Sequence, residues 1–238
     1  MWETDVGVSS DGVLILFHDD SLVRTTDAES VFPWRAPWTT ATFTYSELQM
    51  LDLGSWFLKT DPFGQIAAGG VSQDDLISFR TERIPTLEDA LVFTRDANWR
   101  INIELKRLPA PMEKFPVVEQ VLDLIDRIGI DSQQLVLSSF CHAWLEQISR
   151  RRPDIQIQAL IGLPEETTLN WGDLAFSIYN ARYSLLTERK VRELVAKGVQ
   201  LNVWPVNDEK DMLRFMAAGV SGIITDFPQR LANLLKNR

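Results

Sequence analysis

The 238-residue sequence has little cysteine and little positive charge, and each shortage argues against a class of protein. Its one cysteine, Cys141, allows no internal disulfide framework and cannot form a zinc cluster by itself. Lys and Arg number 24 against 33 Asp and Glu, a net charge of -9, so we expect no nucleic-acid partner. No apolar run approaches the length of a membrane span, so we expect no stable membrane insertion.

The same shortages bear on location and substrate. A lone cysteine fits a reducing compartment, and the N-terminus lacks a basic-then-apolar signal pattern, so we expect a cytoplasmic protein. If the substrate is an anion, an acidic protein must supply positive charge locally. That charge has to come from a metal ion or from a placed Lys or Arg.

Short β-rich runs alternate with helical stretches along most of the chain. Asp11-Gly12 between two apolar runs, 2–8 and 13–18, predicts a hairpin. Residues 20–80 are rich in Pro, Gly, Thr and Trp and predict a long irregular insertion with one helix near 46–53. Further strands are predicted at 101–105, 135–140, 155–161, 176–179, 200–206 and 222–225, and helices at 86–96, 115–128, 142–151, 187–197, 208–217 and 228–236.

This alternation indicates an α/β fold with a parallel sheet and crossover helices. The length suits one α/β barrel or two small domains. Seven parallel-type strands can be counted, so an eight-stranded barrel would lack one. No interdomain linker is visible, and we expect one domain over residues 1–238 with a subdomain at about 20–80.

Charged residues are spaced two apart on two predicted strands. Glu3 and Asp5 leave the same face of their strand, and two adjacent carboxylates repel each other unless a cation lies between them. Oxygen ligands of this kind suit Mg²⁺ or Ca²⁺, although a solvated strand edge is the alternative. Glu104 and Lys106 repeat the pattern at a strand end. They could be a third metal ligand and a phosphate partner, or only a structural ion pair.

Histidine occurs twice in the chain, at His18 and His142. Folding the hairpin brings position 18 roughly opposite positions 3 to 5, where an imidazole beside two carboxylates is a candidate for proton transfer near pH 7. His142 is expected to begin a helix as a capping or surface residue.

The motifs follow one another over essentially the whole chain. They are Glu3-x-Asp5-Val6, Ser10-Asp11-Gly12, Phe17-His18-Asp19-Asp20-Ser21-Leu22-x-Arg24-Thr25-Thr26, Ile84-Pro85-Thr86-Leu87-Glu88, Asn102-Ile103-Glu104-Leu105-Lys106, Ser138-Ser139-Phe140, Trp204-Pro205-Val206-Asn207 and Ile224-Thr225-Asp226-x-Pro228. In this order they resemble the signature of the glycerophosphodiester phosphodiesterases. One departure is Pro205, where the family has Thr, which we interpret as a change in strand-end geometry.

The resemblance implies a TIM (β/α)8 barrel that hydrolyses glycerophosphodiesters, as small-molecule substrates, to sn-glycerol 3-phosphate and an alcohol. By resemblance, Glu3, Asp5 and Glu104 would hold Mg²⁺ or Ca²⁺, and His18 would be one of two acid/base histidines. Lys106 would act on the phosphate, and Trp204 would contact the substrate. The insertion would follow the second barrel strand and shape the pocket for the alcohol.

The family opens with a strand bearing His-Arg-Gly and a helix bearing Glu-Asn, and neither is present in this sequence. We therefore expect the first β/α unit to be missing, through a misplaced start codon or truncation. Unpaired strand edges would then invite self-association, so a homo-oligomer is a possible assembly. Two alternatives remain for function. One is a related barrel phospholipase, sphingomyelinase D-like or phosphatidylinositol-specific, with an apolar mouth that includes Trp34, Trp38 and Trp56. The other is a truncated non-catalytic homologue.

Overall fold

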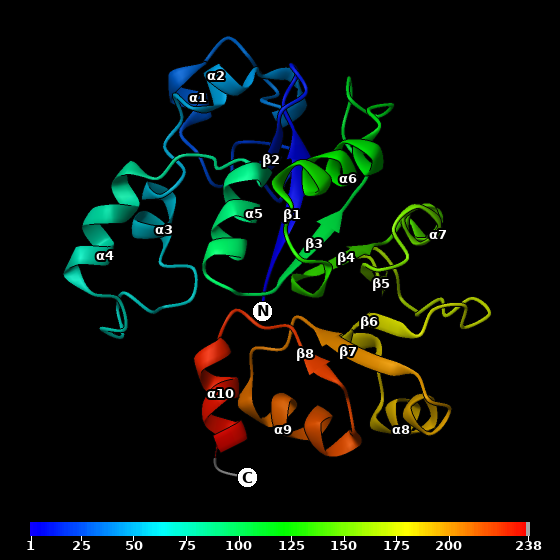
Figure 1. Ribbon diagram of the computed structural model, residues 1–238. Coiled ribbons are helices and arrows are strands. Elements are labelled where there is room, and N and C mark those ends of the chain that lie inside the picture. The colour runs from blue at the N-terminus through cyan, green and yellow to red at the C-terminus, as the bar shows by residue number, and fades with distance from the viewer. Residues whose placement is uncertain (237–238) are drawn as a thin grey trace. The chain divides into compact units, whose positions relative to one another are not determined.

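In the computed structural model, which describes residues 1–236, strands and helices follow one another in nearly the predicted order (Figure 1). They divide into two units, Met1–Leu135 and Val136–Arg238. The single domain expected from the sequence stays a prediction.

The first unit is built on three strands in the order β2-β1-β3. β1 (Trp2–Val8) pairs antiparallel with β2 (Leu14–Leu16) and parallel with β3 (Ile101–Leu105). The helices of this unit are α1 (Ala28–Val31), η1 (Thr40–Thr42), α2 (Tyr45–Leu48), α3 (Ser55–Thr60), α4 (Gln73–Ser78), η2 (Phe79–Thr81), α5 (Leu87–Asp96), α6 (Val117–Ile128) and η3 (Ser132–Gln134).

The predicted hairpin of β1 and β2 is confirmed, and Asp11 fixes its turn. The Ser9 hydroxyl donates to Asp11 Oδ1 at 2.6 Å, and the Tyr45 backbone N–H donates to the same oxygen at 2.9 Å. The Ser9 hydrogen bond holds the pKa of the Asp11 carboxyl below its usual range. Gly12 follows with φ of 86°, a left-handed conformation that favours glycine. The turn is thereby tied to the start of α2.

The insertion between β2 and α5 shares a buried apolar cluster with the hairpin, which was not predicted from the sequence. Its helices α1 to α4 are only four to six residues long. Helices this short are stabilised by tertiary packing rather than by propensity. Apolar side chains from the insertion pack with those of the hairpin in one buried cluster. Its members are Ile15, Phe17, Leu22, Ala28, Phe32, Phe43, Leu48, Leu51 and Ile84.

Helices α5 and α6 lie close to the ranges expected from sequence. Thr86 caps α5 in a capping box with Asp89. Six apolar residues of α6 are buried, and the helix ends at Gly129 with φ of 67°. Arg127 of α6 and Glu88 of α5 form a two-bond ion pair that ties the helices together.

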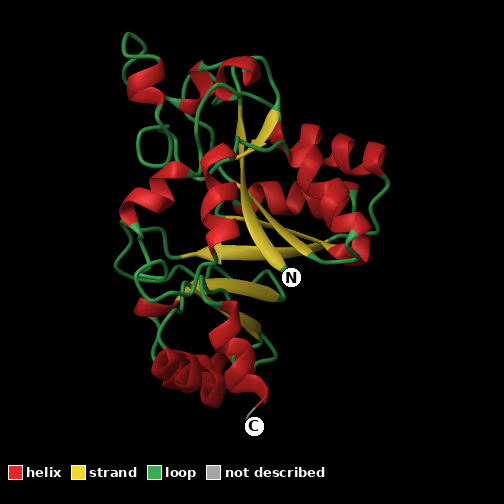
Figure 2. Ribbon diagram, turned by 90° about the vertical axis from the view of Figure 1, so that its left-hand side faces the viewer, coloured by secondary structure: helices red, strands yellow, loops and turns green. Residues whose placement is uncertain are grey.

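The second unit has five parallel strands in the order β4-β5-β6-β7-β8. Helices α8, α9 and α10 lie on one side of β6 to β8 (Figures 1 and 2). No helix within residues 1–236 is both long and apolar enough to cross a membrane. The elements are β4 (Leu135–Ser139), α7 (His142–Arg151), β5 (Gln156–Ile161), β6 (Ile178–Arg182), η4 (Tyr183–Leu185), α8 (Glu188–Ala196), β7 (Gln200–Trp204), α9 (Glu209–Ala218), β8 (Gly222–Ile223) and α10 (Pro228–Lys236).

Candidate active site

Three carboxylates from β1 and β3 meet on one face of the first unit. In the parallel register Asp5 lies beside Glu104, and Glu3 lies one alternation earlier on β1. Glu3 is exposed, whereas Asp5 and Glu104 are half-buried. Each offers a carboxylate oxygen, and the three oxygens lie within 4.8 Å of one another. Side chains almost a hundred residues apart in sequence are therefore brought to one point by strand pairing.

The electrostatics of this cluster favour a cation. Burial raises the pKa of Glu104 to about 8, and the neighbouring charges of Asp5 and Glu3 push it the same way. Lys106 opposes the shift but does not cancel it. A carboxyl group in these surroundings holds a proton near neutral pH unless a metal ion takes the proton's place.

A buried amide on the same strand also fits a metal ion. Asn102 is 3% exposed, and its Oδ1 has no hydrogen-bond partner within residues 1–236. Carboxylates and an amide carbonyl are the oxygen donors that Mg²⁺ and Ca²⁺ prefer. The donor set therefore suits a hard divalent cation.

Lys106 extends β3 toward the second hairpin strand. Its Nζ donates to Asp5 Oδ1 at 3.1 Å and also to the backbone carbonyl of His18. The Lys106 and Asp5 side chains are 19% and 15% exposed, so the pair is shielded from bulk water. This contact joins the carboxylate cluster to the end of the hairpin. It is compatible with both a phosphate partner and the structural ion pair considered from sequence.

His18 lies at the same end of the hairpin with its side chain 70% exposed. The Phe17 backbone N–H donates to the Asp5 carbonyl at 3.2 Å, which places position 18 close to the start of β1, as the hairpin argument expected. The imidazole Nδ1 lies 2.6 Å from Asp19 Oδ1. An ionised carboxylate only accepts hydrogen bonds, so this contact favours the tautomer with its proton on Nδ1, in which Nε2 has the lone pair.

Asp19 and Arg24 were part of a sequence motif, but no role for them was predicted. Arg24 Nε and Nη2 donate to the two Asp19 oxygens at 2.5 and 2.9 Å. This ion pair is the main reason that the pKa of Asp19 is below its usual range. Their spacing gave no signal, because the contact depends on the turn at 22–25 and not on a regular element.

A pocket of about 270 Å³ opens beside His18. The hairpin contributes Leu16 and Phe17 to the walls, and in the insertion Arg24 lies over the Trp56 ring, 5.8 Å from its centroid. Its lining residues are Leu16, Phe17, His18, Asp19, Arg24, Thr25, Leu53 and Trp56.

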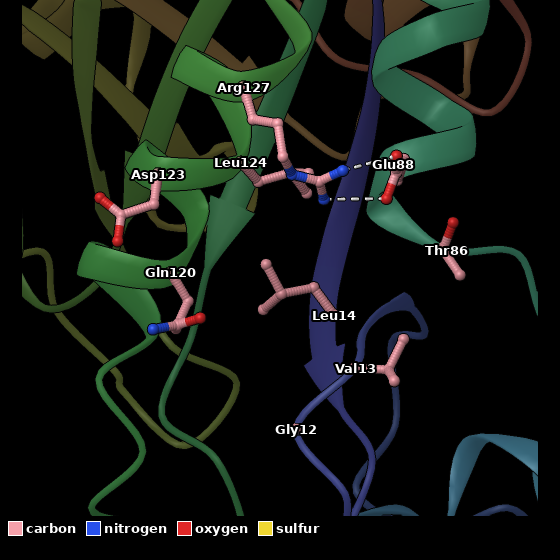
Figure 3. Close-up of a pocket in the computed structure, with 9 residues that line it drawn as sticks. All are labelled: Gly12, Val13, Leu14, Thr86, Glu88, Gln120, Asp123, Leu124 and Arg127. Atoms are coloured by element: carbon pink, nitrogen blue, oxygen red, sulfur yellow. Dashed lines mark hydrogen bonds and ion pairs between the residues drawn. The ribbon is translucent and has the colours of Figure 1, made fainter.

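A second hollow, of about 410 Å³, lies between the hairpin turn and helices α5 and α6 (Figure 3). The Glu88–Arg127 ion pair spans it, while Gln120 and Asp123 line the α6 side (Figure 3). Neither His18 nor any of the three clustered carboxylates lines this hollow. It therefore has none of the groups singled out for the chemistry.

Trp204 ends β7 in the second unit. Its indole N–H donates to the Asn180 carbonyl at 3.0 Å, and its ring packs edge-on against Phe140 at 5.7 Å between centroids. Asn207, three residues later, is hydrogen-bonded to Thr225 and Asp226, so these two sequence motifs are in contact. The predicted contact between Trp204 and substrate stays a prediction.

Taken together, the parallel strands, the carboxylate cluster and the neighbouring Lys and His define a site suited to a phosphate ester and a divalent cation. The model of the glycerophosphoryl diester phosphodiesterase family matches residues 1–230, and this chain belongs to that family. The predicted family and the class of enzyme, a phosphodiesterase, are thereby confirmed.

Two curated relatives are each 30% identical to this chain. One is the glycerophosphodiester phosphodiesterase of Caldanaerobacter subterraneus, aligned over 98% of this chain and 85% of the relative. The other is the mouse glycerophosphoinositol inositolphosphodiesterase GDPD2, aligned over 98% of this chain and 42% of the relative. This chain thus spans most of the bacterial protein and less than half of the mouse protein.

Solved structures show the same fold. A phosphodiesterase from Oleispira antarctica, in complex with the product sn-glycerol-3-phosphate, has a TM-score of 0.75 at 22% identity, over 98% of this chain and 84% of that one. A glycerophosphodiester phosphodiesterase from Parabacteroides distasonis has a TM-score of 0.70 at 23% identity, over 99% and 83%. This likeness confirms the predicted TIM-barrel class of α/β fold.

Proposed function

We propose that this protein hydrolyses glycerophosphodiesters to sn-glycerol 3-phosphate and an alcohol, with a divalent cation held by Glu3, Asp5 and Glu104. The observation that carries the proposal is the convergence of three carboxylate oxygens within 4.8 Å on a strand face, in a chain of this family. A cation bound there would polarise the phosphoryl oxygens and lower the pKa of a bound hydroxyl or water.

Lys106 and His18 serve the phosphate and the proton transfer in this proposal. The Lys106 ammonium lies beside Asp5, where it can stabilise negative charge that develops on the phosphate. Asp19 fixes the proton on Nδ1 of His18, so Nε2 is the nitrogen that exchanges a proton with the reacting group. Its exposed side chain leaves that nitrogen accessible to a substrate.

The pocket beside His18 is the proposed place for the alcohol. It lies on the hairpin and insertion side, and Trp56 offers a flat apolar wall with Arg24 over its ring. A pocket of about 270 Å³ admits a small headgroup such as choline or inositol more readily than an acyl chain. This favours a water-soluble diester over a lysophospholipid.

The test measures product formation from glycerophosphocholine and glycerophosphoinositol, with Mg²⁺, with Ca²⁺ and with chelator. We expect cation-dependent release of sn-glycerol 3-phosphate. Glu104→Gln should abolish this cation-dependent release, whereas Cys141→Ser should leave it intact.

Other products would point to other functions. Release of inositol phosphate in place of glycerol phosphate would favour the activity after which the mouse relative is named. Faster turnover of a lysophospholipid would favour the barrel phospholipase. A folded chain without turnover on any of these substrates would favour the non-catalytic homologue.

A further inference from the structure

Beside the three carboxylates of the cluster lies a fourth side chain with an oxygen atom, that of Asn102. In the β1–β3 register Glu3 lies beside Asn102, just as Asp5 lies beside Glu104. Alternation along β3 puts Asn102 and Glu104 on the same face of the strand. Neighbouring strands lie about 4.8 Å apart, and residues two apart on a strand lie about 6.6 Å apart. The four residues therefore form the corners of a small rectangle.

Asn102 is the most deeply buried of the four corners, and its amide oxygen is unsatisfied among the described residues. The residue is 3% exposed, and its Oδ1 has no hydrogen-bond partner in the described part of the chain, residues 1–236. Its sequence neighbours Ile101 and Ile103 face the other way and are fully buried. A buried amide oxygen without a partner is unfavourable, and such groups in native proteins commonly face an ion or an ordered water.

We propose that the Asn102 amide oxygen is a fourth, neutral ligand of the cation, and that it makes the site prefer Ca²⁺ to Mg²⁺. This inference rests on the proposed function, because it needs a cation at Glu3, Asp5 and Glu104. Ca²⁺ takes six to eight oxygen ligands, amide carbonyls among them, in flexible geometry. Mg²⁺ requires near-ideal octahedral geometry and keeps several waters, so a fourth protein ligand contributes less to its binding.

A neutral donor suits this corner better than another acid. Three carboxylates already outweigh a divalent cation by one negative charge, and the substrate phosphodiester is itself an anion. An amide adds a ligand without adding to this negative charge.

The test is calorimetric titration of the full chain with Ca²⁺ and, separately, with Mg²⁺. Asn102→Ala should weaken Ca²⁺ binding by about 10-fold or more, the order expected when a group at a metal site is lost, and should weaken Mg²⁺ binding much less. Asn102→Asp keeps an oxygen of the same reach, so it should bind Ca²⁺ at least as tightly while raising KM for the anionic diester. The control is Ser138→Ala, which removes another buried side-chain oxygen without a described partner and should change neither affinity.

An equal loss of affinity for Ca²⁺ and Mg²⁺ in Asn102→Ala, or no loss of affinity for either ion, would overturn the inference. If that variant does not fold, Asn102→Asp decides alone, since weaker Ca²⁺ binding there also contradicts a ligand role. A chain with Asn102-dependent Ca²⁺ binding but no turnover would refute the proposed function and leave this inference standing. Turnover together with unchanged Ca²⁺ binding in Asn102→Ala would refute this inference and leave the proposed function standing. A wild-type chain that binds neither cation would contradict both.

Discussion

Glu104 makes the stability of the cation-free protein depend on pH in a direction opposite to that of most acids. Burial and the charges of Asp5 and Glu3 raise its pKa from 4.5 to about 8. Between these two pH values the folded chain holds a proton that the unfolded chain has released. The contribution of Glu104 to the free energy of unfolding is therefore fully present below pH 4.5 and is lost as pH rises toward 8.

The size of the effect follows from the shift. One pH unit corresponds to about 1.36 kcal/mol for one proton, so the free energy of unfolding should fall by roughly 5 kcal/mol across this window. Glu104→Gln replaces the carboxyl by a neutral group of the same shape. In chelator this variant should lose the pH-dependent step and be more stable than wild type at pH 8.

The assay is urea unfolding in chelator at pH 5, 6, 7 and 8, for wild type and Glu104→Gln, repeated with saturating Ca²⁺. Cation binding should release a proton from the cluster and remove the wild-type step. Equal slopes of stability against pH in the two chelated proteins would refute the reasoning, because Glu104 would then keep its ordinary pKa. A wild-type slope unchanged by Ca²⁺ would show that the cluster does not hold the ion.

Three further predictions concern turnover. His18→Ala should reduce kcat about 100-fold with nearly unchanged cation affinity by calorimetry, and an equal loss of cation binding would make His18 a ligand instead. Lys106→Met removes the positive charge beside Asp5, so cation affinity should rise several-fold while kcat falls about 100-fold; weaker cation binding would contradict this. Trp56→Ala should change the KM ratio between glycerophosphocholine and glycerophosphoinositol without altering cation affinity, and an unchanged ratio would place the alcohol elsewhere.

Regular elements were predictable because periodicity and caps agree in this sequence. The helix expected at 86–96 begins after the Thr86 cap, and the one expected at 115–128 is found at Val117–Ile128. The strand expected at 176–179 lies instead at Ile178–Arg182, because its register with β7 begins at Ile178. Short apolar runs show where a strand exists but not where its pairing starts.

The insertion at about 20–80 was predicted, but its internal packing was not, because that packing depends on contacts distant in sequence. Leu22, Phe32 and Phe43 have no common period, yet they pack in one cluster with the hairpin. The Asp19–Arg24 pair depends on the same packing, since the turns that join its members are held by the insertion. Sequence motifs marked both residues, but only the structure shows that Asp19 pairs with Arg24 and also contacts Nδ1 of His18.

The candidate site, like the whole chain, has an excess of negative charge. A net charge of -9 repels an anionic diester over the protein's surroundings, and three carboxylates repel it again at close range. Lys106 is already engaged with Asp5, so one ammonium cannot offset both the cluster and a phosphate. A divalent cation would supply positive charge only where it is bound, among Glu3, Asp5 and Glu104 on β1 and β3. Substrate attraction would then be confined to the point of reaction, and it should disappear in chelator even though the fold persists.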